Sequence, residues 1–128
     1  MAAADRLISR MEQRHASVAV VGAGDYIGSA IARRFARAGY LVVVGRRGGD
    51  KLAPLIESIT VEGGRCVGRG LDARKEDDVA AFIREADAAA PLEVCIFNVG
   101  ANVYFPILET TERVFRKVWE MACHAGFL

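Results

Sequence analysis

The chain has 128 residues, the size of one ordinary domain, and 52% of them are hydrophobic, so it can bury a core. Its 17 Lys and Arg residues almost balance its 16 Asp and Glu residues. This balance excludes a strong field of one sign that would attract nucleic acid or an anionic membrane, so we expect a small-molecule ligand and neither of those partners.

Nothing in the sequence indicates export or insertion into a membrane. No apolar run approaches the roughly 20 residues that a spanning helix needs. The cysteines are odd in number, have no metal-type spacing and lie in apolar sequence, as reduced thiols do; they are Cys66, Cys95 and Cys123. We therefore expect a cytoplasmic protein without a metal site.

Residues 1–15 are expected to form an N-terminal extension outside the main domain. They can form a short amphipathic helix with Leu7, Ile8 and Met11 on one side. A transit peptide is the alternative, because such peptides are also Arg-rich and amphipathic, but the acidic residues Asp5 and Glu12 argue against it.

The first half of the remaining chain has the pattern strand, helix, strand, helix. The apolar run 17–21 predicts a strand, and helical spacing then follows at Ile27, Ile31, Phe35 and Ala38. Gly39 is suited to end this helix, and the valine-rich run 41–44 predicts a second strand. Asp50 is expected to cap a second helix with the apolar stripe Leu52, Leu55, Ile56 and Ile59.

The second half repeats this alternation. A weaker run at 65–68 predicts a third strand, and a third helix follows with the stripe Val79, Phe82, Ile83 and Ala86. Residues 92–97 predict a fourth strand. A final helix is expected to begin near Thr111, with one face made of Val114, Phe115, Val118, Trp119 and Ala122.

Four strands that are each followed by a helix predict an α/β fold, because parallel neighbours need crossover connections. Right-handed crossovers and a glycine-rich first turn favour a doubly wound Rossmann-type sheet in the order 3-2-1-4. We assign residues 16–128 to such a partial domain. Its ligand crevice is expected between strands one and four, at their carboxyl ends.

A glycine turn joins the first strand to the first helix. Gly22 permits a sharp turn, Gly24 removes a side chain that could block a phosphate, and Gly28 lets the helix approach the strand. The N-terminus of the helix, at Tyr26 and Ile27, then offers unpaired N–H groups to a diphosphate. The alternative is a tight turn that binds no ligand.

This turn resembles the TGxxxGxG turn of short-chain dehydrogenases. Gly22 and Gly28 match its first and last glycines, while Val21 replaces the Thr and Tyr26 replaces the middle Gly. The side chain of Tyr26 would lie either over the phosphate region or outward. The resemblance implies a cofactor site at Gly22, Gly24, Tyr26, Ile27 and Gly28.

Two later segments also resemble this family. Asp72 matches the aspartate beside the adenine ring, with a turn or capping role as the alternative. Asn98, Val99 and Gly100 match the family's NAG turn, which implies contact with the ribose, although Asn98 could be a plain turn residue. Ala122 stands where the family usually has the Asn of a catalytic tetrad.

The choice of cofactor is argued from charge. An acidic residue at the end of the second strand would bind the ribose of NAD and repel the extra phosphate of NADP, and none stands there. Arg46 and Arg47 occupy this place, and guanidinium groups suit a phosphate dianion. We therefore expect NADP rather than NAD; solvated loop charges are the alternative.

The resemblance also implies an oxidoreductase that transfers hydride between an alcohol and a carbonyl and forms a homo-oligomer when full length. The family's acid/base pair, a Tyr with a Lys four residues later, is missing, since no Tyr in this chain has a Lys at that spacing. We therefore assign no catalytic residue and expect the chain to be a cofactor-binding half that is inactive alone. The alternatives are a non-catalytic nucleotide-binding or scaffold protein and a truncated product without function.

Overall fold

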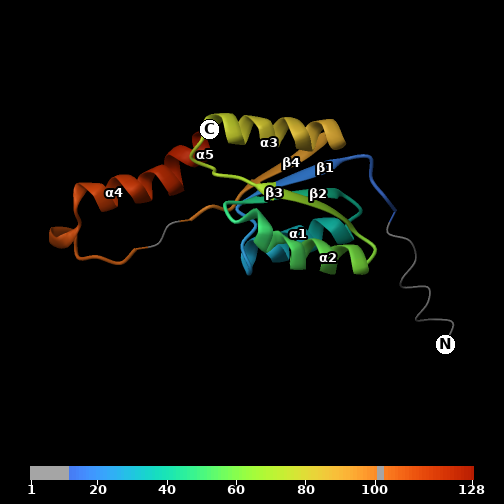
Figure 1. Ribbon diagram of the computed structural model, residues 1–128, viewed down its shortest axis with the longest axis horizontal. Helices are drawn as coiled ribbons and strands as arrows, with labels where there is room; N and C mark the ends of the chain where they lie inside the picture. The colour runs from blue at the N-terminus through green and yellow to red at the C-terminus, as the bar shows by residue number, and fades with distance from the viewer. Residues whose placement is uncertain (1–11, 101–102) are drawn as a thin grey trace.

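A computed structural model of the protein describes residues 12–100 and 103–128. Its centre is a parallel sheet of four strands, β1 (Ser17–Val21), β2 (Leu41–Arg46), β3 (Arg65–Gly70) and β4 (Leu92–Phe97). The strand order is β3-β2-β1-β4, which confirms the predicted order 3-2-1-4 (Figure 1). The helix expected around Leu7 lies outside the described residues.

Helices cover both faces of this sheet (Figure 1). On one face lie α1 (Ile27–Arg37), a short 3-10 helix η1 (Gly49–Leu52) and α2 (Ala53–Val61), and on the other lies α3 (Glu76–Ala89). After β4 the chain leaves the sheet through a short 3-10 helix, η2 (Ile107–Glu109), and enters α4 (Glu112–Trp119). It ends in a π-helical turn, η3 (Glu120–His124), and α5 (Ala125–Phe127).

Strand β1 is the centre of the fold because it pairs with β2 on one side and β4 on the other, and all five of its residues are buried. Its side chains alternate between two cores. Val18 and Val20 pack with α1 and α2, whereas Ala19 and Val21 pack with α3. With this register, the last residue of β1, Val21, pairs with Gly45 of β2 and Phe97 of β4.

The buried face of α1 differs from the predicted stripe. The residues that the helix buries are Gly28, Ala32 and Ala36, whereas Ile27 is 67% exposed and Ile31 and Phe35 are only partly buried. Small side chains face the sheet because the helix crosses it closely. A Cβ on Gly28 would lie 2.6 Å from the carbonyl oxygen of Gly22.

The predicted cap of the second helix is also wrong. Asp50 lies inside the 3-10 helix η1, and the residue that precedes η1 is Gly48. Neither η1 nor α2 begins with a hydrogen bond from a capping side chain. The chain tightens into a 3-10 turn ahead of α2, so the α-helix begins three residues later, at Ala53. The predicted cap at Thr111 is confirmed, because its hydroxyl oxygen accepts a hydrogen bond from the backbone N–H of Val114.

The cysteines do not share one environment, which corrects the expectation that all three lie among apolar groups. Cys66 is buried in β3, and burial raises the pKa of its thiol to about 11. Cys95 and Cys123 are exposed, on β4 and η3. Burial of part of the Cys95 side chain still raises the pKa of its thiol.

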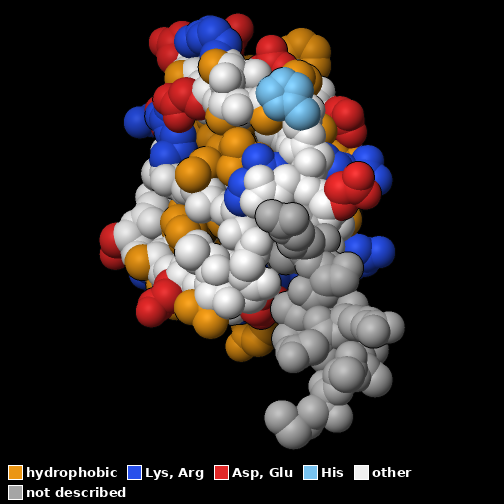
Figure 2. Space-filling model, turned by 90° about the vertical axis from the view of Figure 1, so that its right-hand side faces the viewer, with side chains coloured by type: hydrophobic (Ala, Val, Ile, Leu, Met, Phe, Trp, Pro, Cys, Tyr) orange, Lys and Arg blue, Asp and Glu red, His pale blue; other side chains and the backbone are white. Residues whose placement is uncertain are grey.

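Side chains of both charge signs are interspersed on the face shown in Figure 2, in line with the small net charge. Along the described residues, no helix is long and apolar enough to cross a membrane. The apolar side chains that do reach the surface are concentrated in the last quarter of the chain, and they include Tyr104, Leu108, Phe115, Trp119 and Phe127.

Candidate dinucleotide site

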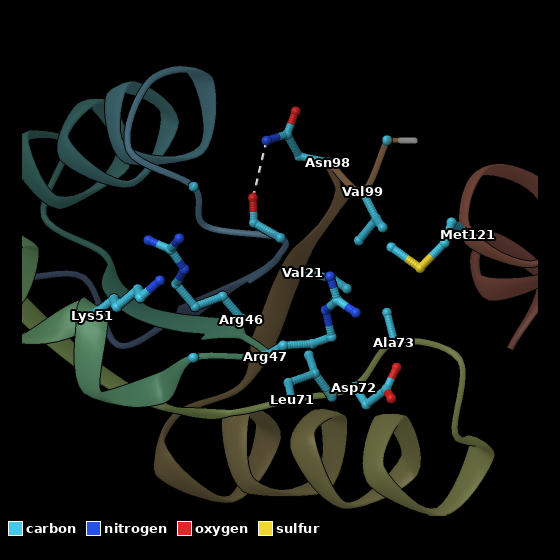
Figure 3. Close-up of a pocket in the computed structure, with 14 residues that line it drawn as sticks. Val21, Arg46, Arg47, Lys51, Leu71, Asp72, Ala73, Asn98, Val99 and Met121 are labelled. Atoms are coloured by element: carbon cyan, nitrogen blue, oxygen red, sulfur yellow. Dashed lines mark hydrogen bonds between the residues drawn. The ribbon is translucent and has the colours of Figure 1, made fainter. Parts of the chain in front are cut away.

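A cleft of about 650 Å³ lies at the carboxyl ends of β1, β2 and β4, where the crevice was predicted (Figure 3). It brings together eight of the residues that the sequence singled out: Gly22, Gly24, Arg46, Arg47, Asp72, Asn98, Val99 and Gly100. It also contains six residues that the sequence did not assign to the site: Val21, Gly48, Lys51, Leu71, Ala73 and Met121.

Gly22 forms the floor of the cleft in a conformation that requires glycine. Its φ angle is +89°, and a Cβ there would lie 2.5 Å from the carbonyl oxygen of Asn98. Its N–H and that of Ala23 both donate to the carbonyl oxygen of Gly45, at 2.9 and 3.0 Å. The turn is thus held against the end of β2.

Gly24 leaves the space above the turn open, since a Cβ built on it would meet no described atom within 4 Å. The carbonyl oxygen of Gly24 accepts hydrogen bonds from the backbone N–H and the hydroxyl of Ser29, at 2.9 and 2.7 Å. These bonds direct the N-terminus of α1 toward the turn. The N–H groups that precede Ser29 at the start of the helix have no intrahelical partner and can bind an anion there.

Tyr26 and Ile27 do not line the cleft with their side chains. Tyr26 is 89% exposed and precedes α1, and Ile27 is the first residue of the helix. Of the two orientations left open for Tyr26, the structure has the outward one. Any contact of these two residues with a ligand in the cleft would be made by backbone N–H groups.

Three cationic side chains line the cleft: Arg46 and Lys51 lie side by side in Figure 3, and Arg47 lies nearer to Leu71 and Asp72. Arg46 ends β2, and its Nη1 donates to Oδ1 of Asp25 at 2.7 Å. Arg47 follows it, and Lys51 is added from η1. The signal for Lys51 in the sequence was its place shortly after the second strand, but only the 3-10 turn brings it back to the cleft.

Asp72 also lines the cleft and forms an ion pair with Arg74. Both of its carboxylate oxygens accept hydrogen bonds from the guanidinium of Arg74, and one also accepts the backbone N–H of Arg74. These hydrogen bonds lower the pKa of the Asp72 carboxyl to about 2. The turn role that the sequence left open is therefore present, and Asp72 also lines the cleft.

Asn98 ties the end of β4 to the glycine turn. Its backbone N–H donates to the carbonyl oxygen of Val21 at 2.8 Å, and its Nδ2 donates to the carbonyl oxygen of Gly22 at 3.0 Å (Figure 3). Val99 and Gly100 continue the wall of the cleft, and a Cβ on Gly100 would meet no described atom within 4 Å. The segment that follows β4 thus leaves room for a ligand.

The family model for short chain dehydrogenases matches residues 16–128. The chain belongs to the short-chain dehydrogenase family. This confirms the resemblance inferred from the glycine turn and the segment at Asn98. Tyr26 and Ala122 stay as departures from the family's usual residues.

Solved short-chain dehydrogenases have the same fold. One from Rhodopseudomonas palustris is 69% identical, with a TM-score of 0.86 over 89% of this chain and 54% of that chain. A variant of the actinorhodin polyketide ketoreductase, in a structure with NADPH, is 25% identical, with a TM-score of 0.82 over 90% of this chain and 45% of that chain.

Curated relatives of the chain are named as reductase-like proteins. The hydroxynaphthalene reductase-like protein Arp2 of Metarhizium majus is 32% identical over 110 residues, which is 84% of this chain and 41% of that protein. The Arp2 protein of Metarhizium acridum is 30% identical over the same length. The chain therefore spans about two fifths of the length of these relatives.

Proposed function

We propose that this chain forms the NADP-binding half of a short-chain dehydrogenase/reductase that transfers hydride between an alcohol and a carbonyl group. The observation that carries this proposal is that three cations, Arg46, Arg47 and Lys51, line the same cleft as the glycine turn. Cations at this place suit the extra phosphate that distinguishes NADP from NAD.

The residues of the cleft fit such a dinucleotide. The open space over Gly24 and the N-terminus of α1 would take the diphosphate, and the wall at Asn98 to Gly100 would contact a ribose. Asp72 would lie beside the adenine, and Arg46 would meet the 2′-phosphate. Bound NADPH would supply the hydride.

We propose further that residues 1–128 do not catalyse the reaction by themselves. Proton transfer in this family uses a Tyr with a Lys four residues later, and none of Tyr26, Tyr40 and Tyr104 has such a Lys. A small carbonyl or alcohol as substrate, assembly into a homo-oligomer and a cytoplasmic location complete the proposal for the whole protein.

Calorimetric titration of the purified protein with NADPH and NADH tests the choice of cofactor. We expect NADPH to bind on the order of tenfold more tightly, and Arg46→Asp to reverse the order, because the new carboxylate would repel the phosphate. Arg84→Asp is the matched control, since it reverses an exposed charge on α3, away from the cleft. Equal affinities of the unchanged protein for both cofactors would contradict the proposal.

A second candidate is a non-catalytic protein that binds the nucleotide as a sensor or scaffold. It is favoured by Ala122, which is exposed and occupies the position of the tetrad Asn. Reduction of a panel of aldehydes and ketones by the complete protein with NADPH distinguishes the two candidates. The third candidate is a truncated gene product without a function, and such a chain would not unfold cooperatively.

A further inference from the structure

We infer that Asp25 limits the preference of the cleft for NADP, because its carboxylate occupies Arg46 where a 2′-phosphate would bind. This inference rests on the proposed function and adds a selectivity residue to it. In the sequence, Asp25 stands in the middle of the glycine turn, and no motif assigns it a role.

The contact between the two side chains follows from the way the turn is fixed. Asp25 and Arg46 are 21 residues apart in the sequence, and Nη1 of Arg46 donates to Oδ1 of Asp25 at 2.7 Å. The turn is held at the end of β2 because Gly22 and Ala23 both donate to the carbonyl oxygen of Gly45. The acidic residue that is missing from the end of β2 is thus supplied by the glycine turn.

A recess of about 210 Å³ lies beside this ion pair, and it contains both Asp25 and Arg46. Lys51 and Arg46 line this recess as well as the main cleft, so the two spaces have these two cations in common. A third cation, Arg33, also borders the recess, but it donates to the hydroxyl of Ser58 and lies 3.8 Å from a carboxylate oxygen of Glu62. Among the residues that line the recess, Asp25 is the one with a carboxylate, and this carboxylate is bonded to Arg46.

The two side chains of the pair differ in exposure to solvent. The side chain of Arg46 is 22% exposed, whereas that of Asp25 is 73% exposed and can turn into water. A phosphate dianion that approaches Arg46 must share the guanidinium with Asp25 or displace it, and the two anions repel each other. A ribose hydroxyl carries no charge and can donate a hydrogen bond to the carboxylate. Asp25 therefore weakens NADP binding and leaves NAD binding unchanged or stronger.

The experiment is calorimetric titration of Asp25→Asn and of the unchanged protein with two pairs of probes, NADPH with NADH and adenosine 2′,5′-bisphosphate with adenosine 5′-monophosphate. The amide keeps the size of the side chain and removes the charge. We expect the preference for the phosphorylated member of each pair to rise on the order of tenfold at low salt. The gain should shrink at 0.5 M salt, because salt screens exposed charges.

Glu57→Gln is the matched control, because it removes one exposed carboxylate from α2 in the same way and should leave both preferences unchanged. Asp25→Ser is a second variant without the charge, and thermal unfolding of each variant verifies that it folds. If the unchanged protein prefers NADPH and neither Asp25 variant raises the preference beyond the control, the inference is wrong and the proposed function stands. If none of the four probes binds, both are wrong.

Discussion

Gly22 meets two constraints that other amino acids would violate. Its φ of +89° is strained for any residue with a side chain, and its missing Cβ leaves room for the backbone of Asn98. Both constraints act on the same residue because the turn passes directly under the end of β4. The floor of the cleft therefore depends on this position more than on Gly24, where a Cβ would meet no described atom within 4 Å.

We expect Gly22→Ala to lower the free energy of unfolding by about 2 to 4 kcal/mol, the sum of backbone strain and overpacking. Gly24→Ala is the control, because a Cβ there meets no described atom within 4 Å. Urea unfolding of the two variants measures the difference. Equal losses in both would show that the contact with Asn98 has no energetic role.

The ion pair of Asp72 predicts a dependence of stability on pH. Hydrogen bonds from Arg74 lower the pKa of the folded carboxyl from 3.8 to about 2, so the folded state favours the charged form. The resulting stabilisation is present above pH 4 and is lost as the pH falls toward 2. We expect Asp72→Asn to reduce the free energy of unfolding by about 1 to 2 kcal/mol at pH 7, and much less at pH 2.

Unfolding free energies at several pH values measure this effect. The control is Asp77→Asn, which removes an exposed carboxylate from the first turn of α3. A loss of stability for Asp72→Asn that stays constant down to pH 2 would mean that the carboxylate charge is not its cause.

At the residue scale, the glycines and Arg46 could be predicted because their spacing follows directly from the strand and the helix between which they lie. The partner of Arg46 could not be predicted, because Asp25 belongs to a different element and the pair forms only when the turn meets β2. Met121 was missed for the same reason, since it reaches the cleft from η3 near the end of the chain.

At the scale of elements, apolar spacing located the helices but not the face that α1 buries. The spacing of large apolar residues predicts that these residues are buried. In α1 the helix lies close to the sheet, and the buried residues are the small ones, Gly28, Ala32 and Ala36. In α3 the large residues Val79 and Phe82 are buried as predicted, because that helix is seated on the other core. The size of the residues at a crossing therefore carries information that hydrophobicity alone does not.

Helix α4 differs from the other long helices in its packing. None of its residues 112–119, all of which the structure describes, is buried, and Phe115 is 66% exposed. In Figure 1 this helix extends away from the sheet. The backbone hydrogen bonds of α4 are therefore shielded from water by the helix itself and by little packing against other elements.

We expect the backbone amides of α4 in the 128-residue chain to exchange with deuterium much faster than those of β1 and β2, because opening α4 exposes little apolar surface. Hydrogen exchange followed by mass spectrometry of peptides from each segment measures this. The amides of α3, which buries Phe82 completely, serve as the internal reference. Protection of α4 equal to that of β1 would mean that the helix is held by contacts absent from this arrangement.

At the scale of the whole molecule, the strand order could be predicted because the alternation of strands and helices leaves few right-handed arrangements. The strand ends were harder to predict: β2 and β3 each continue two residues beyond the predicted run, through Arg46 and Gly70. These added residues are glycines and arginines that an apolar pattern does not detect. They are paired with each other across the sheet, which is a property of the assembled fold.

The bond from Asn98 to Gly22 has a thermodynamic consequence for ligand binding. It joins the end of the last strand in sequence to the turn after the first one, so the pocket is complete only after the sheet has closed around β1. A nucleotide that binds this pocket recognises the finished assembly and not a partly folded chain containing β1 to β3. Saturating ligand would therefore raise the melting temperature of the whole sheet by mass action, and would sharpen its cooperativity by depopulating forms in which β4 is detached.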